Sequence, residues 1–333
     1  MRGKKSHLLV GVAFSAIFLL AACGNGDGGG PKSVSMGIAV KNDISNSPLV
    51  IAKEKGIYED YGLDVDVIYF EGGGAMVQAL TGGQVDYGWV SHTPVIKAAS
   101  QGAPVNVIAE VSSSAIGWGL MVTPDSPIEK PEDIESGMKI SYTSEGALTN
   151  WLALYEASLA GLSPDEVEGA PIGTSLPTIT TALEKGQVDA ATVLLPWGYE
   201  LENSGDARWV AKMPEQLPDF SYTGIDATDD ALEDGNTAEC VVGAYTATID
   251  WMKDNPDETQ QWFSDFYSVN SELAERSYDE LMPDFSDDGQ LSVDVFQNTI
   301  DTILKMPGFL QGEPKSEDVL QQVKPASKNE CSK

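Results

Sequence analysis

Histidine is almost absent from this chain, and cysteine is scarce. The histidines are His7 and His92, and the cysteines are Cys23, Cys240 and Cys331. A metal site needs several histidine, cysteine or carboxylate ligands at suitable spacings, and His92 has no such partner near it in the sequence. The chain also lacks a G-x-S-x-G elbow and a phosphate-binding P-loop. We therefore expect no enzymatic activity, no metal and no cofactor.

Basic residues are few compared with acidic ones. The chain has 20 lysines and arginines against 51 aspartates and glutamates, which gives a formal net charge of −31. Such a surface repels phosphates, so we expect no nucleic-acid partner. Hydrophobic residues make up 42% of the chain, as in ordinary globular proteins, and this excludes disorder for most of it.

No hydrophobic run is long enough to cross a bilayer permanently. The apolar segment 8–22 follows Arg2, Lys4 and Lys5, an arrangement typical of a signal peptide. The end of the segment and the next residue form LAAC at 20–23, which resembles a bacterial lipobox and implies that Cys23 is lipid-modified and becomes the first mature residue. The alternative is an ordinary signal peptide with a chance cysteine at its end.

The lipobox interpretation predicts an extracytoplasmic protein anchored to the cell membrane by lipid on Cys23. Residues 1–22 are then the signal peptide, and residues 23–32 are a glycine-rich flexible linker. Removal of residues 1–22 takes away three basic residues and no acidic one, which changes the net charge to −34.

The two remaining cysteines suggest a cross-link near the C-terminus. Outside the cytoplasm Cys240 and Cys331 can be oxidised to a disulfide that holds the tail, residues 326–333, against the body of the protein. The alternative is a pair of free thiols.

The body of the chain alternates between strand and helix patterns. Hydrophobic periodicity and glycine or proline positions predict two successive β-α-β-α units followed by a helix-rich region from about residue 236. This order is typical of mostly parallel sheets flanked by helices. The predicted strands are 33–40, 63–70, 85–90, 105–111, 139–142 and 188–194, and the predicted helices include 47–55, 75–81, 94–101, 146–160, about 176–183 and 295–305.

An internal repeat supports two lobes of similar topology. The segment ALTGGQVD at 79–86 returns as ALEKGQVD at 182–189, with six of eight positions identical. In both copies a helix ends, Gly83 or Gly186 supplies a left-handed turn, and an aspartate precedes a buried strand. The alternative is a chance similarity of two helix–turn–strand units.

The segment SPLVIAKEKGIYEDYGLDVDVIYFEGGGAMVQALTGGQVDYGWVSHTPVIKAASQGAPVNVIA, residues 47–109, resembles the nitrate/sulfonate/taurine family of ABC-importer substrate-binding proteins. The similarity continues through AGLS at 160–163 and the second repeat copy, and covers about half of the chain. It implies a two-lobed type II periplasmic-binding-protein fold that closes on a ligand. Lobe 1 is then 33–125 completed by about 225–325, lobe 2 is 126–222, and the helices of 236–325 pack mainly on lobe 1.

Candidate ligand-binding residues follow from the rule that ligands bind at the carboxyl ends of strands in open α/β sheets. The resemblance implies that the loops concerned face the cleft between the lobes. The candidates are Asn46, Ser47, Gly74, Ser91, His92, Thr93, Trp118, Thr143, Ser144, Glu145 and Trp197.

Each candidate also has a structural explanation. The serines Ser47, Ser91 and Ser144 are residues that commonly cap helices. Trp197 fits either a pocket wall or a core. Glu145 could hold the amine of a zwitterion or point to solvent near a helix start.

The sequence therefore predicts a monomeric solute-binding lipoprotein that captures a sulfonate- or taurine-like anion or zwitterion. Its partners would be an ABC permease and the ATPase of that importer. Two rivals are an enzyme or pyrimidine-precursor-binding protein on the same fold, with His92 as a general base in the enzyme case, and a surface lipoprotein that binds another protein. The enzymatic pyrimidine-synthase branch carries a cysteine-rich motif that this chain lacks.

Overall fold

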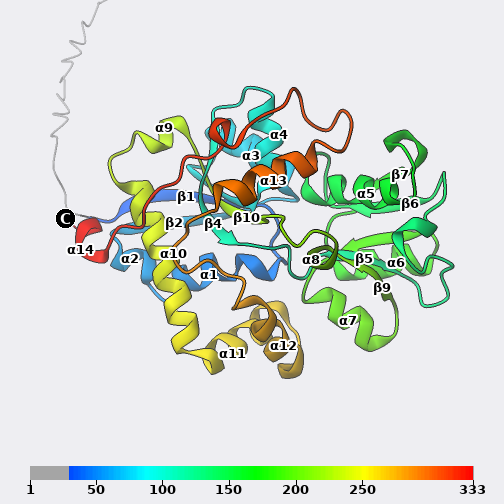
Figure 1. Ribbon diagram of the computed structural model, residues 1–333. Coiled ribbons are helices and arrows are strands. Elements are labelled where there is room, and N and C mark those ends of the chain that lie inside the picture. The colour runs from blue at the N-terminus through cyan, green and yellow to red at the C-terminus, as the bar shows by residue number, and fades with distance from the viewer. Residues whose placement is uncertain (1–29, 333) are drawn as a thin grey trace, which may run out of the picture. The chain divides into compact units, whose positions relative to one another are not determined.

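Two five-stranded sheets form the framework of the protein (Figure 1). The computed structural model describes residues 30–332, so the predicted signal peptide and Cys23 lie outside the described residues. The first sheet has the order β2-β1-β3-β10-β4 and the second has the order β7-β6-β8-β5-β9. We call the parts built on these sheets lobe 1 and lobe 2.

In each sheet one antiparallel strand is inserted among parallel ones. In lobe 1, β10 pairs antiparallel with β3 and β4, whereas β1 pairs parallel with β2 and β3. In lobe 2, β5 pairs antiparallel with β8 and β9, whereas β6 pairs parallel with β7 and β8. The strands are β1 (Lys32–Ile38), β2 (Leu63–Tyr69), β3 (Tyr87–Ser91), β4 (Val105–Ser112), β5 (Gly119–Val122), β6 (Lys139–Tyr142), β7 (Glu168–Pro171), β8 (Ala190–Val193), β9 (Arg208–Lys212) and β10 (Thr223–Thr228).

The inserted strands show how the chain crosses between the lobes. It leaves lobe 1 after β4, enters lobe 2 at β5, and returns after α8 to form β10 of lobe 1. Residues 113–118 and 217–222 are therefore the two crossovers. The sequence analysis predicted neither β10 nor the antiparallel direction of β5.

Helices flank both sheets. Those that follow lobe 1 strands are α1 (Ser47–Glu54), α2 (Ile57–Asp60), α3 (Gly73–Thr81), α4 (His92–Ser100) and α9 (Asp229–Leu232). Lobe 2 contains α5 (Leu148–Leu159), α6 (Leu176–Glu184), α7 (Trp197–Ser204) and α8 (Met213–Gln216). The C-terminal part contains α10 (Thr237–Asp254), α11 (Pro256–Tyr267), α12 (Ser271–Leu281), α13 (Val293–Ile303) and α14 (Lys328–Cys331). Short 3-10 turns lie at Ile44–Asn46, Pro131–Asp133, Pro164–Glu166 and Ser316–Asp318.

The internal repeat occupies the same place in each lobe, so the interpretation of two related lobes is confirmed. Gly83 and Gly186 both have positive φ, 68° and 61°. The backbone N–H of Asp86 donates to Ser35 in β1, and that of Asp189 donates to Lys139 in β6. The carboxylate of each aspartate accepts the backbone N–H of the same partner at 2.7 Å. Each repeat thus connects two neighbouring parallel strands, β3 to β1 in lobe 1 and β8 to β6 in lobe 2.

The core of lobe 1 extends into the C-terminal helices. α10 packs against α1 and α2, and Tyr245 on α10 contacts Trp89 of β3 edge to face at 5.6 Å. Cys240 on α10 and Cys331 on α14 form a disulfide, with their Cα atoms 5.7 Å apart. The C-terminal tail is therefore covalently held to lobe 1.

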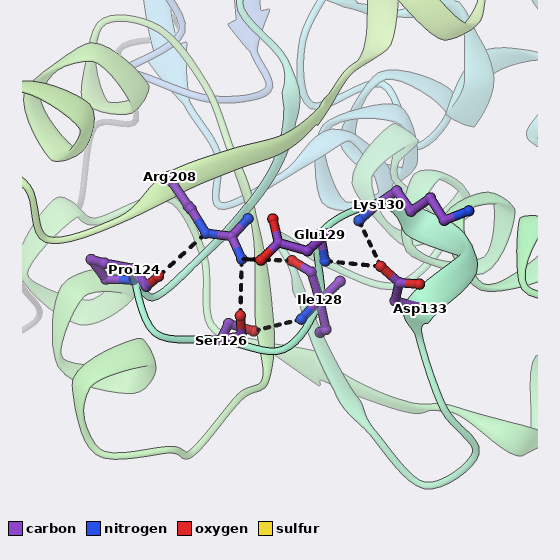
Figure 2. Close-up of polar contacts among 7 residues, drawn as sticks. All are labelled: Pro124, Ser126, Ile128, Glu129, Lys130, Asp133 and Arg208. Carbon is purple, nitrogen blue, oxygen red and sulfur yellow. Dashed lines mark hydrogen bonds and ion pairs between the residues drawn. The ribbon is translucent and has the colours of Figure 1, made fainter.

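A single arginine organises the connection that follows β5 in lobe 2 (Figure 2). Arg208, at the start of β9, donates to the carbonyl oxygens of Ser126 and Ile128, each at 2.9 Å. It also forms an ion pair with Glu129 at 3.0 Å. Because the guanidinium satisfies backbone acceptors, it fixes a loop that has no regular secondary structure of its own.

Within residues 30–332, no helix is both long enough and apolar enough to cross a membrane.

Candidate functional site

A small cavity lies where loops from the two lobes meet. Lobe 1 contributes the segment after β1 and the end of β3, and lobe 2 contributes the segment after β6 and the start of α5. The polar residues that line it are Asp43, Asn46, Ser91, Thr143, Thr149, Tyr222 and Thr223, and the indoles are Trp89 and Trp118. We call this space the inner cavity. Its position agrees with the rule that ligands bind at the carboxyl ends of parallel strands.

The two crossovers meet at the inner cavity. Trp118, on the first crossover, donates its indole N–H to the hydroxyl of Tyr222, on the second, at 2.5 Å. Tyr222 in turn donates to the carboxylate of Asp43. This chain of hydrogen bonds joins both connections between the lobes to the loop that follows β1.

Asp43 is a buried acidic residue in this cavity, with 7% of its surface exposed. Its other carboxylate oxygen accepts the backbone N–H of Ser45 at 3.0 Å and the Ser45 hydroxyl at 2.7 Å. Burial raises the pKa of Asp43 above its usual range, because the charged form loses hydration, and the bonds from Tyr222 and Ser45 act in the opposite direction.

Side-chain hydrogen bonds also fix other residues of the cavity wall. The Asn46 amide donates to the carbonyl of Val40 at 2.5 Å. Across the cavity, the Thr149 hydroxyl accepts the backbone N–H of Thr143 at 2.9 Å and lies 2.8 Å from the Thr143 hydroxyl. These bonds pre-organise both walls, so little ordering remains when a ligand binds.

Of the predicted serines and threonines, Ser91 and Thr143 line the inner cavity. Ser91 precedes α4, but its side chain makes no capping hydrogen bond. Outside this lining, the hydroxyls of Ser47, Thr93 and Ser144 are buried and have no hydrogen-bond partner. A buried hydroxyl without a partner is unfavourable, and a bound polar ligand is one way to satisfy it.

Seven of the eleven predicted residues are not among those that line the inner cavity: Ser47, Gly74, His92, Thr93, Ser144, Glu145 and Trp197. His92 is buried with its ring against Phe296 at 5.3 Å, and burial lowers its pKa to about 3, so it is neutral. Trp197 begins α7 and packs against hydrophobic residues of both lobes. Glu145 is exposed, and its carboxylate accepts the hydroxyl of Tyr142. His92 and Trp197 therefore do not line the inner cavity, contrary to the sequence prediction.

The lobes touch where α3 faces the segment after β6. A methyl group added at Gly74 would collide with the backbone carbonyl of Glu145, and one added at Gly72 would collide with the Ser144 side chain. Gly74 therefore acts at the contact between the lobes, whereas its neighbour Gly73 lines the cavity. This close approach, together with a cavity volume of only about 30 Å³, describes a closed arrangement of the lobes.

A second, larger space lies beside the first and shares Val40 with it. It has a cavity volume of about 420 Å³ and is lined by residues 40–42 and 69–71 of lobe 1 and by 172–175 and Thr178 of lobe 2. We call it the outer cavity. Lys41 is the only basic residue among its described lining residues, and its ammonium lies 5.6 Å from the centre of the Tyr69 ring. The start of α6, preceded by Ser175, lies on the opposite wall.

Sequence reasoning missed Asp43, Trp89, Thr149, Tyr222 and Thr223. Asp43 lies in the loop after the first strand that the strand-end rule selects, so that rule already points to its neighbourhood. Tyr222 and Thr223 belong to the second crossover and β10, whose place beside β3 depends on pairing between distant segments.

A family model described as NMT1/THI5 like matches residues 44–259. The chain belongs to this family. A taurine-binding periplasmic protein of Escherichia coli K12 is 28% identical over 227 residues, which cover 59% of this chain and 67% of that protein. A Bacillus subtilis (strain 168) protein whose name describes binding of aliphatic sulfonates is 26% identical over 287 residues, 81% of each chain.

Structural comparison gives the same fold. The periplasmic aliphatic sulphonate binding protein SsuA of Escherichia coli superposes with a TM-score of 0.70 at 18% identity, covering 89% of this chain and 94% of that chain. The prediction of a two-lobed periplasmic-binding-protein fold is therefore confirmed. A more distant relative, 23% identical over 247 residues covering 72% of this chain and 67% of that protein, is a 4-amino-5-hydroxymethyl-2-methylpyrimidine phosphate synthase of Aspergillus parasiticus.

Proposed function

We propose that this chain is the solute-binding component of an ABC importer. It captures a small organic anion or zwitterion of the sulfonate or taurine type between its lobes and delivers it to a permease. The observation that carries this proposal is the inner cavity, whose walls come from the strand ends of both lobes. Family membership and relatives named for ABC transport, taurine and sulfonates support it.

Capture requires the lobes to separate. A cavity volume of about 30 Å³ accommodates one or two water molecules, so a larger solute enters only when the lobes open. Hinge closure of two lobes around a solute is a known mode of conformational change. The crossovers at 113–118 and 217–222 are the segments that would bend.

The outer cavity supports recognition of an acidic group. Lys41 carries a positive charge at this position, and Ser175 and Thr178 at the start of α6 line the same space, where the end of a helix favours negative charge. The carboxylate of Glu71 lines the same space, so Lys41 is the one charged group there that attracts a sulfonate or carboxylate.

We further propose that the chain acts as a monomeric binding protein and not as an enzyme, and that lipid on Cys23 anchors it outside the cytoplasm. His92, the histidine that an enzymatic mechanism would have used, is neutral and buried away from the inner cavity. Among residues 30–332, no group of histidine, cysteine and acidic side chains is arranged to hold a metal ion.

A pyrimidine precursor is the second candidate ligand. The rings of Trp89, Trp118 and Tyr222 line the inner cavity, and aromatic walls suit a planar heterocycle. The relationship to a pyrimidine phosphate synthase points in the same direction.

Thermal denaturation with a ligand panel tests the proposal. The panel contains taurine, alkanesulfonates, nitrate and aminopyrimidines, and we expect at least one sulfonate or taurine-like compound to raise the melting temperature. Isothermal titration calorimetry then measures its affinity, and product analysis by mass spectrometry checks that the compound is returned unchanged. The proposal fails if no compound of the panel stabilises the protein or if the bound compound is converted.

A further inference from the structure

The inner cavity combines an acidic side chain with an absence of positive charge. Asp43 lines it, and no lysine or arginine is present among its described lining residues. An anion placed there would face a carboxylate with no counter-charge, which is unfavourable in a poorly hydrated space. The inner cavity is therefore poorly suited to the acidic end of a ligand.

The carboxylate of Asp43 still has capacity to accept a hydrogen bond. A carboxylate offers about four lone-pair positions. Three are used by the backbone N–H of Ser45, the Ser45 hydroxyl and the Tyr222 hydroxyl. The Trp118 indole N–H also acts on this carboxylate, but its direct hydrogen bond goes to Tyr222, so a donor that enters the cavity can take the remaining position.

The donors around Asp43 also hold it in place. Tyr222 is itself fixed by the N–H of Trp118, and the Tyr267 hydroxyl donates to the backbone carbonyl of Asp43 at 3.3 Å. A carboxylate that is oriented before the ligand arrives binds an amino group without an additional ordering cost.

We infer that the inner cavity recognises an amino group of the ligand, which donates a hydrogen bond to the Asp43 carboxylate, while the acidic end of the ligand extends to Lys41 in the outer cavity. The inference rests on the function proposed above and specifies its ligand class as an amino-bearing solute. Val40 lines both cavities and directly precedes Lys41 in the chain, so the space beside Asp43 and the space beside Lys41 share a wall.

Pairs of compounds that differ by one amino group test this inference. Isothermal titration calorimetry compares taurine with propane-1-sulfonate, in which a methyl group replaces the ammonium, and 4-aminopyrimidine with 4-methylpyrimidine. We expect the amino-bearing member of a bound pair to bind at least tenfold more tightly. Equal affinity of both members in every bound pair would overturn the inference.

Two variants locate the effect at Asp43. Asp43→Asn keeps the shape of the side chain but removes its charge, and we expect it to abolish most of the tenfold preference. Tyr222→Phe removes the hydroxyl that orients Asp43, and we expect a smaller loss. The matched control is Asp64→Asn, since Asp64 is exposed on β2 outside both cavities and its replacement changes the net charge equally.

The outcomes separate this inference from the proposed function. If aminopyrimidine binds with the amino preference but no sulfonate binds, the ligand class of the proposed function is wrong and the inference stands. If alkanesulfonates bind and taurine has no advantage, the function stands and the inference is wrong. If Asp43→Asn and Asp64→Asn both retain the full preference for the amino-bearing compound, Asp43 is not the acceptor. If no compound of any pair binds, both the proposed function and the inference are wrong.

Discussion

Gly74 of lobe 1 lies directly against the backbone carbonyl of Glu145 in lobe 2, with no room for a side chain at the glycine. The contact joins α3 to the loop after β6 and exists because the lobes are closed. The opening that we propose for ligand entry would separate the two loops and break this contact. A substitution at Gly74 therefore tests closure of the lobes through the contact with Glu145, without depending on a contact with the ligand.

Gly74→Ala is expected to weaken ligand binding without destabilising the free protein. Gly74 lies in α3 and has an ordinary helical backbone, so alanine should favour the helix by up to about 1 kcal/mol. The added methyl group would collide with the Glu145 carbonyl on closure, and we expect an affinity loss of about tenfold or more. Calorimetry and thermal denaturation measure the two effects.

The matched control for this variant is Gly30→Ala, where nothing lies within 4 Å of the added methyl group. We expect it to leave affinity unchanged. An unchanged affinity in Gly74→Ala as well would show that ligand binding does not require the closed contact.

Binding of an amino-bearing ligand should weaken as the pH falls. Burial raises the pKa of Asp43, and only its ionised form pairs with an ammonium group. Affinity should therefore be full above this raised pKa and fall by up to tenfold for each pH unit below it. The nearby tyrosines Tyr222 and Tyr267 have pKa values raised well above 10, and they stay neutral throughout this range.

His92 cannot produce such a pH profile, because burial lowers its pKa to about 3 and its ring lies against Phe296. Calorimetric titrations between pH 4 and pH 8 measure the effect, and Asp43→Asn should flatten the profile. A profile that is the same in the wild type and in this variant would contradict the assignment of the titration to Asp43.

The disulfide should contribute to stability but not to binding. It links Cys240 to Cys331 across a sequence separation of 91 residues, and cross-links of this kind typically stabilise by about 2–4 kcal/mol. Neither cysteine lines the inner or outer cavity. We expect Cys240→Ala/Cys331→Ala, or reduction of the wild type, to lower the melting temperature with unchanged ligand affinity.

Reductant provides the control for the cysteine variant. It should have no effect on the melting temperature of Cys240→Ala/Cys331→Ala, which has no cross-link to lose. If reductant leaves the wild-type melting temperature unchanged too, the disulfide is absent or does not stabilise the fold.

Asp226 is expected to reduce stability at neutral pH. It is fully buried on β10, and burial raises its pKa well above the usual value, with the backbone N–H of Val90 acting in the opposite direction. The unfolded chain ionises this group near pH 4, whereas the folded chain keeps it neutral to higher pH. The unfolded state therefore binds fewer protons, and stability falls as the pH rises from about 4 to the raised pKa.

Asp226→Asn removes this linkage. We expect the free energy of unfolding at pH 7 to rise by about 1–3 kcal/mol. The buried Asn amide has two N–H groups that need acceptors, and this cost favours a value near the lower end of the range. The gain should disappear at pH 4. Urea denaturation at both pH values measures it, with Asp64→Asn as the control, and a variant that is less stable at pH 7 would contradict the prediction.

The sequence predicted the lobes well because their signals are local. The repeat at 79–86 and 182–189 contains its own helix end, left-handed glycine and strand start, and these features determine the turn whatever surrounds it. Residues at strand ends, such as Asn46, Ser91 and Thr143, were found because a parallel sheet brings those ends to one edge.

The missed residues depend on contacts between distant segments. Tyr222 reaches Asp43 only because β10 inserts between β3 and β4, which the local sequence does not specify. His92 follows β3 as a cleft residue should, yet its ring turns toward Phe296 on α13, some two hundred residues later in the chain. Strand-end position predicts the loop, but packing decides the direction of each side chain.

Both ends of the described chain belong to the same lobe. β1 begins at Lys32, whose backbone N–H donates to Gly62 at 2.7 Å, and the disulfide fixes Cys331 to α10 (Figure 1). The chain passes between lobe 1 and lobe 2 only at the crossovers 113–118 and 217–222, and Tyr199 of α7 also bonds to Glu280 of α12. A tether attached ahead of Lys32 would thus hold the protein through lobe 1, so opening of the lobes would move lobe 2 relative to the attached part.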